Sequence, residues 1–183
     1  MRVGGSSKKG SSFERGVLSK LSLWVSGGDR KDLYRRSILS GGRTTIALKE
    51  GSSEFSSQAG DASLACPSHD VACRFLEVFL TEFKHYKNIH FESLVFEIPK
   101  DSSIYSFWLK LKDQSRQLRK LPFLVARQNY KKDILILNSA GVQVLDIGFT
   151  VVAYYRKLDA NLFFFDEFLE ADVNKTCLIY SNK

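Results

Sequence analysis

Three charged side chains near the middle of the chain have the types and spacing of a hydrolytic metal site. Glu82 and Lys84 are separated by one residue, and Asp61 lies upstream, directly after Gly60. In a β-strand alternate side chains share a face, so Glu82 and Lys84 project together while Phe83 points away. Two neighbouring carboxylates suit Mg²⁺, which prefers oxygen ligands and retains water. The pattern indicates metal-assisted hydrolysis, with Lys84 orienting the attacking water or neutralising developing charge.

The competing interpretation is structural: Glu82 and Lys84 form a surface pair and Asp61 belongs to a turn. Glu-x-Lys tripeptides are common, so the pair alone carries little weight. We interpret residues 74–86 as one central, buried strand and expect a neighbouring strand to begin at Asp61. The face that carries the pair is apolar before it, through Leu76, Val78 and Leu80. Burying a charged pair there without a purpose would be costly, which favours a site.

A third carboxylate comes from the first predicted helix. This helix begins with Ser11 or Ser12 as N-cap and stops at Gly27-Gly28. Its apolar positions recur at helical spacing at Phe13, Val17, Leu18, Leu21, Trp24 and Val25. Glu14 shares this buried stripe. It either stabilises the helix N-terminus or points inward at a site, and the sequence leaves both open.

The remaining pattern predicts an α/β fold around a mixed sheet. Helical spacing covers residues 103–120, and a short helix is expected around residues 161–171. Strands are predicted at residues 44–48, 123–128, 134–138 and 142–147, and loops at residues 29–43 and 50–60.

The amino-acid composition excludes several classes of protein. The 183 residues are 44% hydrophobic, which excludes an intrinsically disordered chain. No apolar run is long enough to span a membrane, the first twelve residues lack the apolar core of a secretory signal, and three cysteines are too few for a disulfide framework. We therefore expect a cytoplasmic protein. The net charge of +7 is concentrated in the first two-thirds of the chain, as expected if that part faces a polyanion.

The order of these motifs resembles the PD-(D/E)xK nuclease superfamily, and within it the archaeal-type and phage Holliday junction resolvases. Those proteins open with a basic-Gly-Ser segment that leads into a helix with a catalytic Glu, matched here by residues 9–15. An Arg-Ser-Gly-rich loop matches residues 36–43, and Gln114 and the strand at residues 123–129 match the elements after Glu-x-Lys. The resemblance covers residues 8–138. It departs at Gly60, where proline is usual before the Asp.

The resemblance implies a restriction-endonuclease-like mixed central sheet flanked by helices. It implies that Asp61, Glu82 and the backbone carbonyl of Phe83 bind one or two Mg²⁺ ions, for which Mn²⁺ can substitute. Lys84 would be the catalytic lysine, and Glu14 the helix carboxylate and a further ligand. The reaction would be hydrolysis of a DNA phosphodiester that leaves a 5′-phosphate. Resolvases of this kind act in DNA recombination and repair as homodimers, because a four-way junction needs two symmetric nicks. A phage-encoded member would act in the host cytoplasm.

Two further sets of expectations follow. Residues 1–10 are expected to form a flexible basic arm, residues 11–138 the nuclease core, and residues 139–183 an extension on the core or at a dimer interface. Candidate DNA contacts are Lys8, Lys9, Arg15, Arg35, Arg36, Arg43, Gln114, Arg127, Gln128 and Asn129.

Two alternative functions remain open. One is a RecB-like or restriction-type nuclease that acts on ends, flaps or single strands, and the other is a non-catalytic DNA-binding protein.

Overall fold

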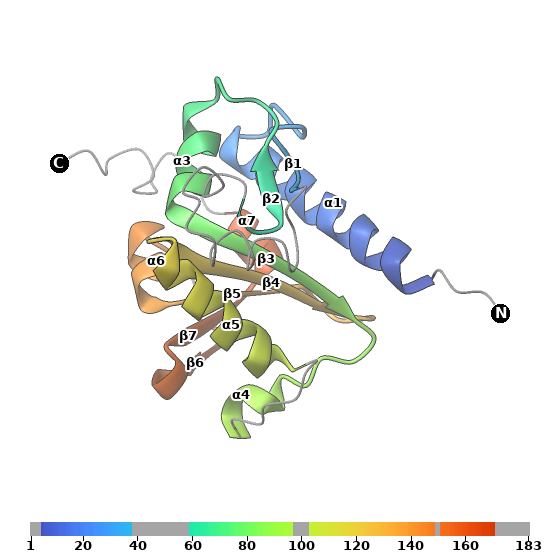
Figure 1. The fold of residues 1–183 in the computed structure, drawn as a ribbon, viewed down its shortest axis with the longest axis vertical. Helices are drawn as coiled ribbons and strands as arrows, with labels where there is room; N and C mark the ends of the chain where they lie inside the picture. The colour runs from blue at the N-terminus through green and yellow to red at the C-terminus, as the bar shows by residue number, and fades with distance from the viewer. Residues whose placement is uncertain (1–4, 38–58, 97–102, 149–150, 171–183) are drawn as a thin grey trace.

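The computed structural model describes residues 5–37, 59–96, 103–148 and 151–170 (Figure 1). Helices and strands alternate along the chain, as an α/β fold requires. The helices are α1 Gly5–Val25, α3 Asp70–Val78, α4 Glu92–Phe96, α5 Ile104–Gln117, α6 Ser139–Val144, the 3₁₀ turn η2 Arg156–Leu158 and α7 Phe165–Leu169. The strands are β1 Tyr34–Arg36, β2 Ala62–Leu64, β3 Phe79–Tyr86, β4 Leu121–Gln128, β5 Ile134–Leu137, β6 Ala153–Tyr155 and β7 Ala160–Phe164.

A five-stranded mixed sheet in the order β3-β4-β5-β7-β6 forms the centre of the molecule. β3 and β4 are parallel, with Glu82 opposite Leu124 and Lys84 opposite Ala126, and the other pairs are antiparallel. Parallel neighbours need a crossover connection, and here α4 and α5 supply it. The short β1–β2 ribbon lies beside β3. The predicted α/β architecture with a mixed sheet flanked by helices is confirmed.

Each face of the sheet has its own hydrophobic core. Phe79, Phe83, Phe123 and Val125 face α1, α3, α6 and α7, where the aromatic rings of Phe75, Phe79 and Phe123 pack against one another. Leu80, Leu124 and Ile136 face the opposite way and pack against α4 and α5. Because alternate residues of a strand point to opposite faces, β3 directs Glu82 and Lys84 toward α5, and Phe83 and His85 toward α1.

The predicted strand at residues 74–86 is wrong in its first part. Residues 74–78 belong to α3, and β3 begins only at Phe79. His69 caps α3, because its side chain accepts a hydrogen bond from the Ala72 N–H, and Ala72, Phe75 and Leu76 form the buried stripe. Leu76 and Val78 therefore do not precede the charged pair on one strand face. The stretch is not continuously apolar, because Arg74 and Glu77 interrupt it. The buried Ala72, Phe75 and Leu76 follow helical spacing, a signal that the strand prediction overlooks.

Four other predictions need correction. The run at residues 142–147 contains the end of α6, which Asn138 caps through a hydrogen bond from the Gly141 N–H, and no strand. The predicted helix around residues 161–171 begins later, because β7 occupies its first part before α7. The loop predicted at residues 29–43 contains β1. The first helix starts at Gly5, earlier than either predicted cap.

The strand expected to begin at Asp61 is present as β2, but it pairs with β1 in a separate ribbon and not with β3. The remaining predicted elements either hold or cannot be compared. The helix at residues 103–120 and the strands at residues 123–128 and 134–138 are confirmed as α5, β4 and β5. The strand predicted at residues 44–48, and most of the loop at residues 50–60, lie outside the described residues. In the part of the chain that the structure describes, no helix is long and apolar enough to span a membrane.

Candidate active site

Asp61 is held against β3 by its own backbone and by Gly60. Gly60 has a left-handed φ of +88°, and a Cβ at this position would lie 2.6 Å from the Thr81 carbonyl oxygen, so only glycine allows this approach. The Asp61 N–H then donates to the Thr81 carbonyl at 2.9 Å, and the Ala62 N–H donates to Thr81 Oγ1 at 3.1 Å. The Asp61 carboxylate accepts the Phe83 N–H at 2.7 Å. These bonds fix the carboxylate beside the middle of β3.

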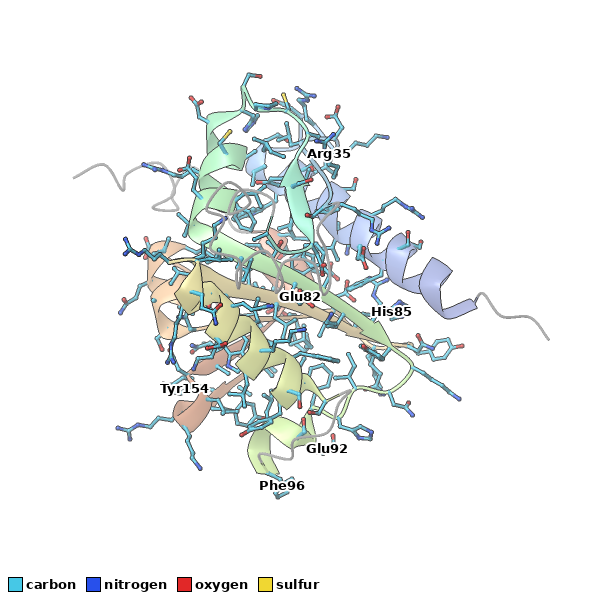
Figure 2. All side chains as sticks on the ribbon, in the orientation of Figure 1. Arg35, Glu82, His85, Glu92, Phe96 and Tyr154 are labelled. Atoms are coloured by element: carbon cyan, nitrogen blue, oxygen red, sulfur yellow. The ribbon has the colours of Figure 1, made fainter. Side chains whose placement is uncertain are left out.

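Glu82 and Lys84 lie next to Asp61 on the face of β3 that α5 covers. They form an ion pair with each other, and about a quarter of each side chain is exposed (25% for Lys84 and 24% for Glu82). The Lys84 ammonium also lies over the ring of Phe107 in α5, 5.3 Å from its centroid. Figure 2 shows Glu82 midway along β3, close to the centre of the molecule. The pair is thus held between the sheet and α5.

Glu14 reaches the site from α1, and its side chain is 17% exposed. Its carboxylate is paired with the Arg36 guanidinium of β1, which also donates to Ser11 Oγ at 3.2 Å. Glu14 is close enough to Asp61 to disfavour ionisation of that carboxyl. The structure therefore brings together Glu14, Asp61, Glu82 and Lys84 from three separate segments.

The electrostatics of the site are dominated by its carboxylates. Burial, together with the neighbouring Glu82 carboxylate, raises the pKa of Asp61 to about 7, although the Phe83 N–H and Lys84 act in the opposite direction. Burial disfavours the charged Lys84 ammonium and by itself would lower its pKa. The Glu82 carboxylate has the larger combined effect, so the pKa of Lys84 is raised. Lys84 therefore compensates the charge of ionised Asp61 only in part, and a bound cation would supply the rest.

The donor set suits a hard divalent cation. Within the described residues no group of three or more His, Cys, Asp or Glu side chains is arranged to hold a metal. An ion here would be held by the Asp61 and Glu82 carboxylates, the Phe83 carbonyl and water. Mg²⁺ is commonly bound in this way, through one or two carboxylates with several waters retained.

A pocket of about 190 Å³ opens beside the Glu82–Lys84 pair. Gln114, a candidate DNA contact, lines it from α5 together with Ser106, Phe107 and Lys110. Ser106, Lys110 and Gln114 are four residues apart and share one helix face. Sequence analysis missed Ser106, Phe107 and Lys110. The spacing back from Gln114 could have identified Ser106 and Lys110, but nothing local showed that this face of α5 covers β3.

The other predicted DNA contacts are dispersed. Arg15 and Arg35 are exposed on α1 and β1, and Gln128 ends β4 opposite Tyr86. Arg127 and Asn129 face away from the pocket: Arg127 pairs with Asp133, and Asn129 Oδ1 contacts His85 Nε2 at 2.9 Å. Lys8 and Lys9 belong to the first turns of α1, where only the backbone is described, and Arg43 lies outside the described residues.

A mixed sheet whose edge strand carries Glu-x-Lys, with an Asp on the adjoining segment and a Glu on the first helix, is the arrangement of the PD-(D/E)xK nuclease superfamily. A family model described as "phage putative PDDEXK endonuclease" matches residues 5–167. The chain belongs to this family. No curated protein matches the chain, and no solved structure does.

Proposed function

We propose that this protein is a Mg²⁺-dependent DNA endonuclease of the Holliday junction resolvase type, which cuts branched DNA by paired, symmetric nicks as a homodimer. Mn²⁺ would substitute for Mg²⁺. The observation that carries the nuclease assignment is the convergence of Asp61, Glu82 and Lys84 around the Phe83 backbone. The preference for branched DNA rests on the order of the basic, Gly-Ser and Arg-rich motifs that flank these residues.

When bound, the metal ion would stabilise charge on the phosphate oxygens and lower the pKa of a bound water. The residues of this chain hold the reacting groups in place. The Phe83 N–H and the backbone bonds to Thr81 hold Asp61 in a single orientation, so the carboxylate does not reorganise during the reaction. Glu82 and Phe107 hold the Lys84 ammonium at the mouth of the pocket.

From this place Lys84 can donate a hydrogen bond to the attacking water or to a phosphate oxygen. Attack by water breaks the bond between phosphorus and the 3′ oxygen, which leaves as a hydroxyl and gives a 5′-phosphate. Lys110 and Gln114 stand on the other wall of the pocket and can bind the adjacent phosphate. The strand would then run between β3 and α5, with the scissile phosphate next to Asp61.

The test is a cleavage assay with Mg²⁺ on a labelled four-way junction, a flap, a linear duplex and a single strand, each with an EDTA control. We expect paired nicks confined to the junction. Glu82→Ala and Lys84→Ala should abolish cleavage and leave DNA binding nearly intact. Glu92→Ala, which removes an exposed carboxylate of α4, should cut at the wild-type rate.

The remaining outcomes separate the alternatives. Cutting of ends, flaps or single strands in place of the junction would establish a nuclease of the RecB-like or restriction type. Tight binding of DNA without any cutting would leave a non-catalytic DNA-binding protein. Wild-type cleavage by both Glu82→Ala and Lys84→Ala would overturn the site assignment. If the protein sediments as a monomer both alone and with junction DNA, the proposed homodimer is refuted.

A further inference from the structure

A second and larger pocket, of about 550 Å³, lies on the opposite face of the sheet from the Glu82–Lys84 pair. It opens between α1 and the turn that joins β4 to β5. The almost fully buried Phe13 and Val17 line it from α1, and the polar side chains of His85 and Arg127 line it from β3 and β4. Figure 2 shows His85 toward the end of β3 that lies beside α1.

The pocket is kept open at Gly16, which lies inside α1 and lines the cavity. Glycine is among the least favourable residues within a helix, so its presence there needs a reason. A Cβ at Gly16 would meet nothing within 4 Å. No close packing therefore requires glycine, but a larger side chain would extend into the space between α1 and the turn.

The walls of this pocket are planar groups fixed by their neighbours. The Arg127 guanidinium lies over the Phe13 ring at 4.8 Å and is held by Asp133, with Nη2 to Oδ2 at 2.6 Å. The Phe13 ring packs against the His85 ring at 5.3 Å between centroids. Lys20, on the rim, is paired with Asp166 at 2.8 Å. Arg127 and Lys20 are each paired with an Asp carboxylate, so neither cation is left to bind an anion. The planar walls therefore suit a neutral planar ligand better than a metal ion.

Tyr130 stands at the tip of the β4–β5 turn and lines the same pocket. Its side chain is fully exposed, at 102%. Its φ of 63° is left-handed, a conformation that favours glycine or asparagine. The turn is closed by a hydrogen bond from the Lys131 N–H to the Gln128 carbonyl at 3.1 Å, so the ring is presented on a fixed support. Lys131 and Lys132 follow and are exposed.

An open recess, an exposed aromatic ring and adjacent lysines are elements with which proteins bind unpaired nucleotides, because a base stacks on an aromatic ring and lysines bind the phosphates. We propose that this pocket takes one unpaired nucleotide of a DNA substrate, with its base stacked on Tyr130 and seated in the open recess beside Gly16. The inference rests on the proposed function and narrows the branched DNA substrate to junctions that present an unpaired nucleotide near the cut.

The position of the pocket agrees with this role. Phe13 and Glu14 are consecutive on α1, and Lys84 and His85 are consecutive on β3. The two segments that place Glu14 and Lys84 at the active site therefore also build the second pocket. A strand cut beside Asp61 can thus extend past the end of β3 to Tyr130, and an opened base pair or a branch point would release the base that the pocket receives.

The first test fills the pocket from α1. Gly16→Leu places a branched side chain in the open space. Gly16→Ala is the matched control, because it also raises the helix propensity at this position but adds only a methyl group. Binding is measured in EDTA, so that no cleavage occurs, to two duplexes of one sequence, one fully paired and one with a single unpaired 2-aminopurine. We expect Gly16→Leu to weaken binding of the second duplex by about tenfold and to remove its fluorescence change. Binding of the paired duplex should stay within about twofold of wild type for both variants.

The second test removes the stacking ring without touching the core. Tyr130→Ala should give the same selective loss, and Tyr130→Phe should retain wild-type binding, because stacking needs only the ring. Tyr154→Ala, which removes another exposed tyrosine on β6, is the control and should change nothing. Wild-type affinity for the unpaired duplex in Gly16→Leu or in Tyr130→Ala, or an equal loss on both duplexes, would overturn the proposal.

Because these measurements are made without metal, they are independent of catalysis. If the protein shows the selective losses in EDTA but cuts no DNA with Mg²⁺, the nuclease proposal fails and the nucleotide pocket stands. If it cuts DNA and shows no selective loss, the pocket fails and the nuclease stands.

Discussion

Replacing Asp61 by Asn should stabilise the metal-free protein at neutral and alkaline pH. Asn is nearly isosteric and neutral, and its side-chain oxygen can still accept the Phe83 N–H. Burial and Glu82 raise the pKa of Asp61 from 3.8 to about 7, so the fold favours the protonated form. The stability linked to that proton is fully present below about pH 4, and it is lost as the pH rises through about 7.

The size of the effect follows from the same pKa values. Each pKa unit corresponds to about 1.4 kcal/mol, so a rise from 3.8 to about 7 gives an upper limit of about 4 kcal/mol. Because Asp61 and Glu82 share their repulsion, we expect Asp61→Asn to raise the free energy of unfolding by roughly 2–4 kcal/mol at pH 8. The gain should grow between pH 4 and 7 and stay constant above that range.

The assay is denaturation by urea in EDTA across this pH range, with Asp113→Asn as a control for an exposed carboxylate of α5. Addition of Mg²⁺ should stabilise the wild type and have little effect on Asp61→Asn, because the variant lacks the charge that holds the ion. A variant that is less stable than wild type at pH 8 in EDTA, or a gain that does not change with pH, would refute the reasoning.

Two further predictions concern the support of the site. Gly60→Ala should lower the free energy of unfolding by about 2 kcal/mol or more in chemical denaturation, since it adds left-handed strain and a contact with the Thr81 carbonyl. Unchanged stability would mean that the chain does not approach β3 as described. Lys110→Ala should raise KM for DNA about fivefold to tenfold with kcat nearly unchanged, because it removes a phosphate contact and leaves Asp61 in place. Arg116→Ala, on another face of α5, should leave both constants unaltered, and an equal KM effect in the two variants would argue against a specific role of the pocket.

Much of the central arrangement could be predicted from local sequence. The alternation of a strand places Glu82 and Lys84 on one face wherever β3 begins, so the misassigned residues 74–78 did not affect the pair. Asp61 was placed beside it because Gly60-Asp61 marks the start of the adjoining segment. The division within residues 74–86 was also open to prediction, because Ala72, Phe75 and Leu76 follow helical spacing. Its exact position is harder to predict, since α3 runs into β3 with no Gly or Pro between them.

What could not be predicted depends on how elements pack. Lys110 belongs to the pocket only because the crossover lays one face of α5 over β3, and no local pattern states that. Arg127 and Asn129 lie at the end of β4, the neighbour of β3, yet they contact Asp133 and His85 on the other face of the sheet. The place of Gly16 at a cavity depends in the same way on packing, because the cavity forms only where α1 lies beside the β4–β5 turn.

The way the active site is divided along the chain affects how activity arises during folding. Residues 79–128 form one crossover unit that contains Lys84 and its pocket, whereas Glu14 and Asp61 arrive from outside this unit. Contacts between segments distant in sequence carry the largest loop-closure penalty and tend to form late. A chain that has folded only its crossover unit has Lys84 and Glu82 in place but lacks Asp61 and Glu14. Hydrolytic capacity would therefore appear only with the completed tertiary structure, so folding intermediates would be harmless to DNA.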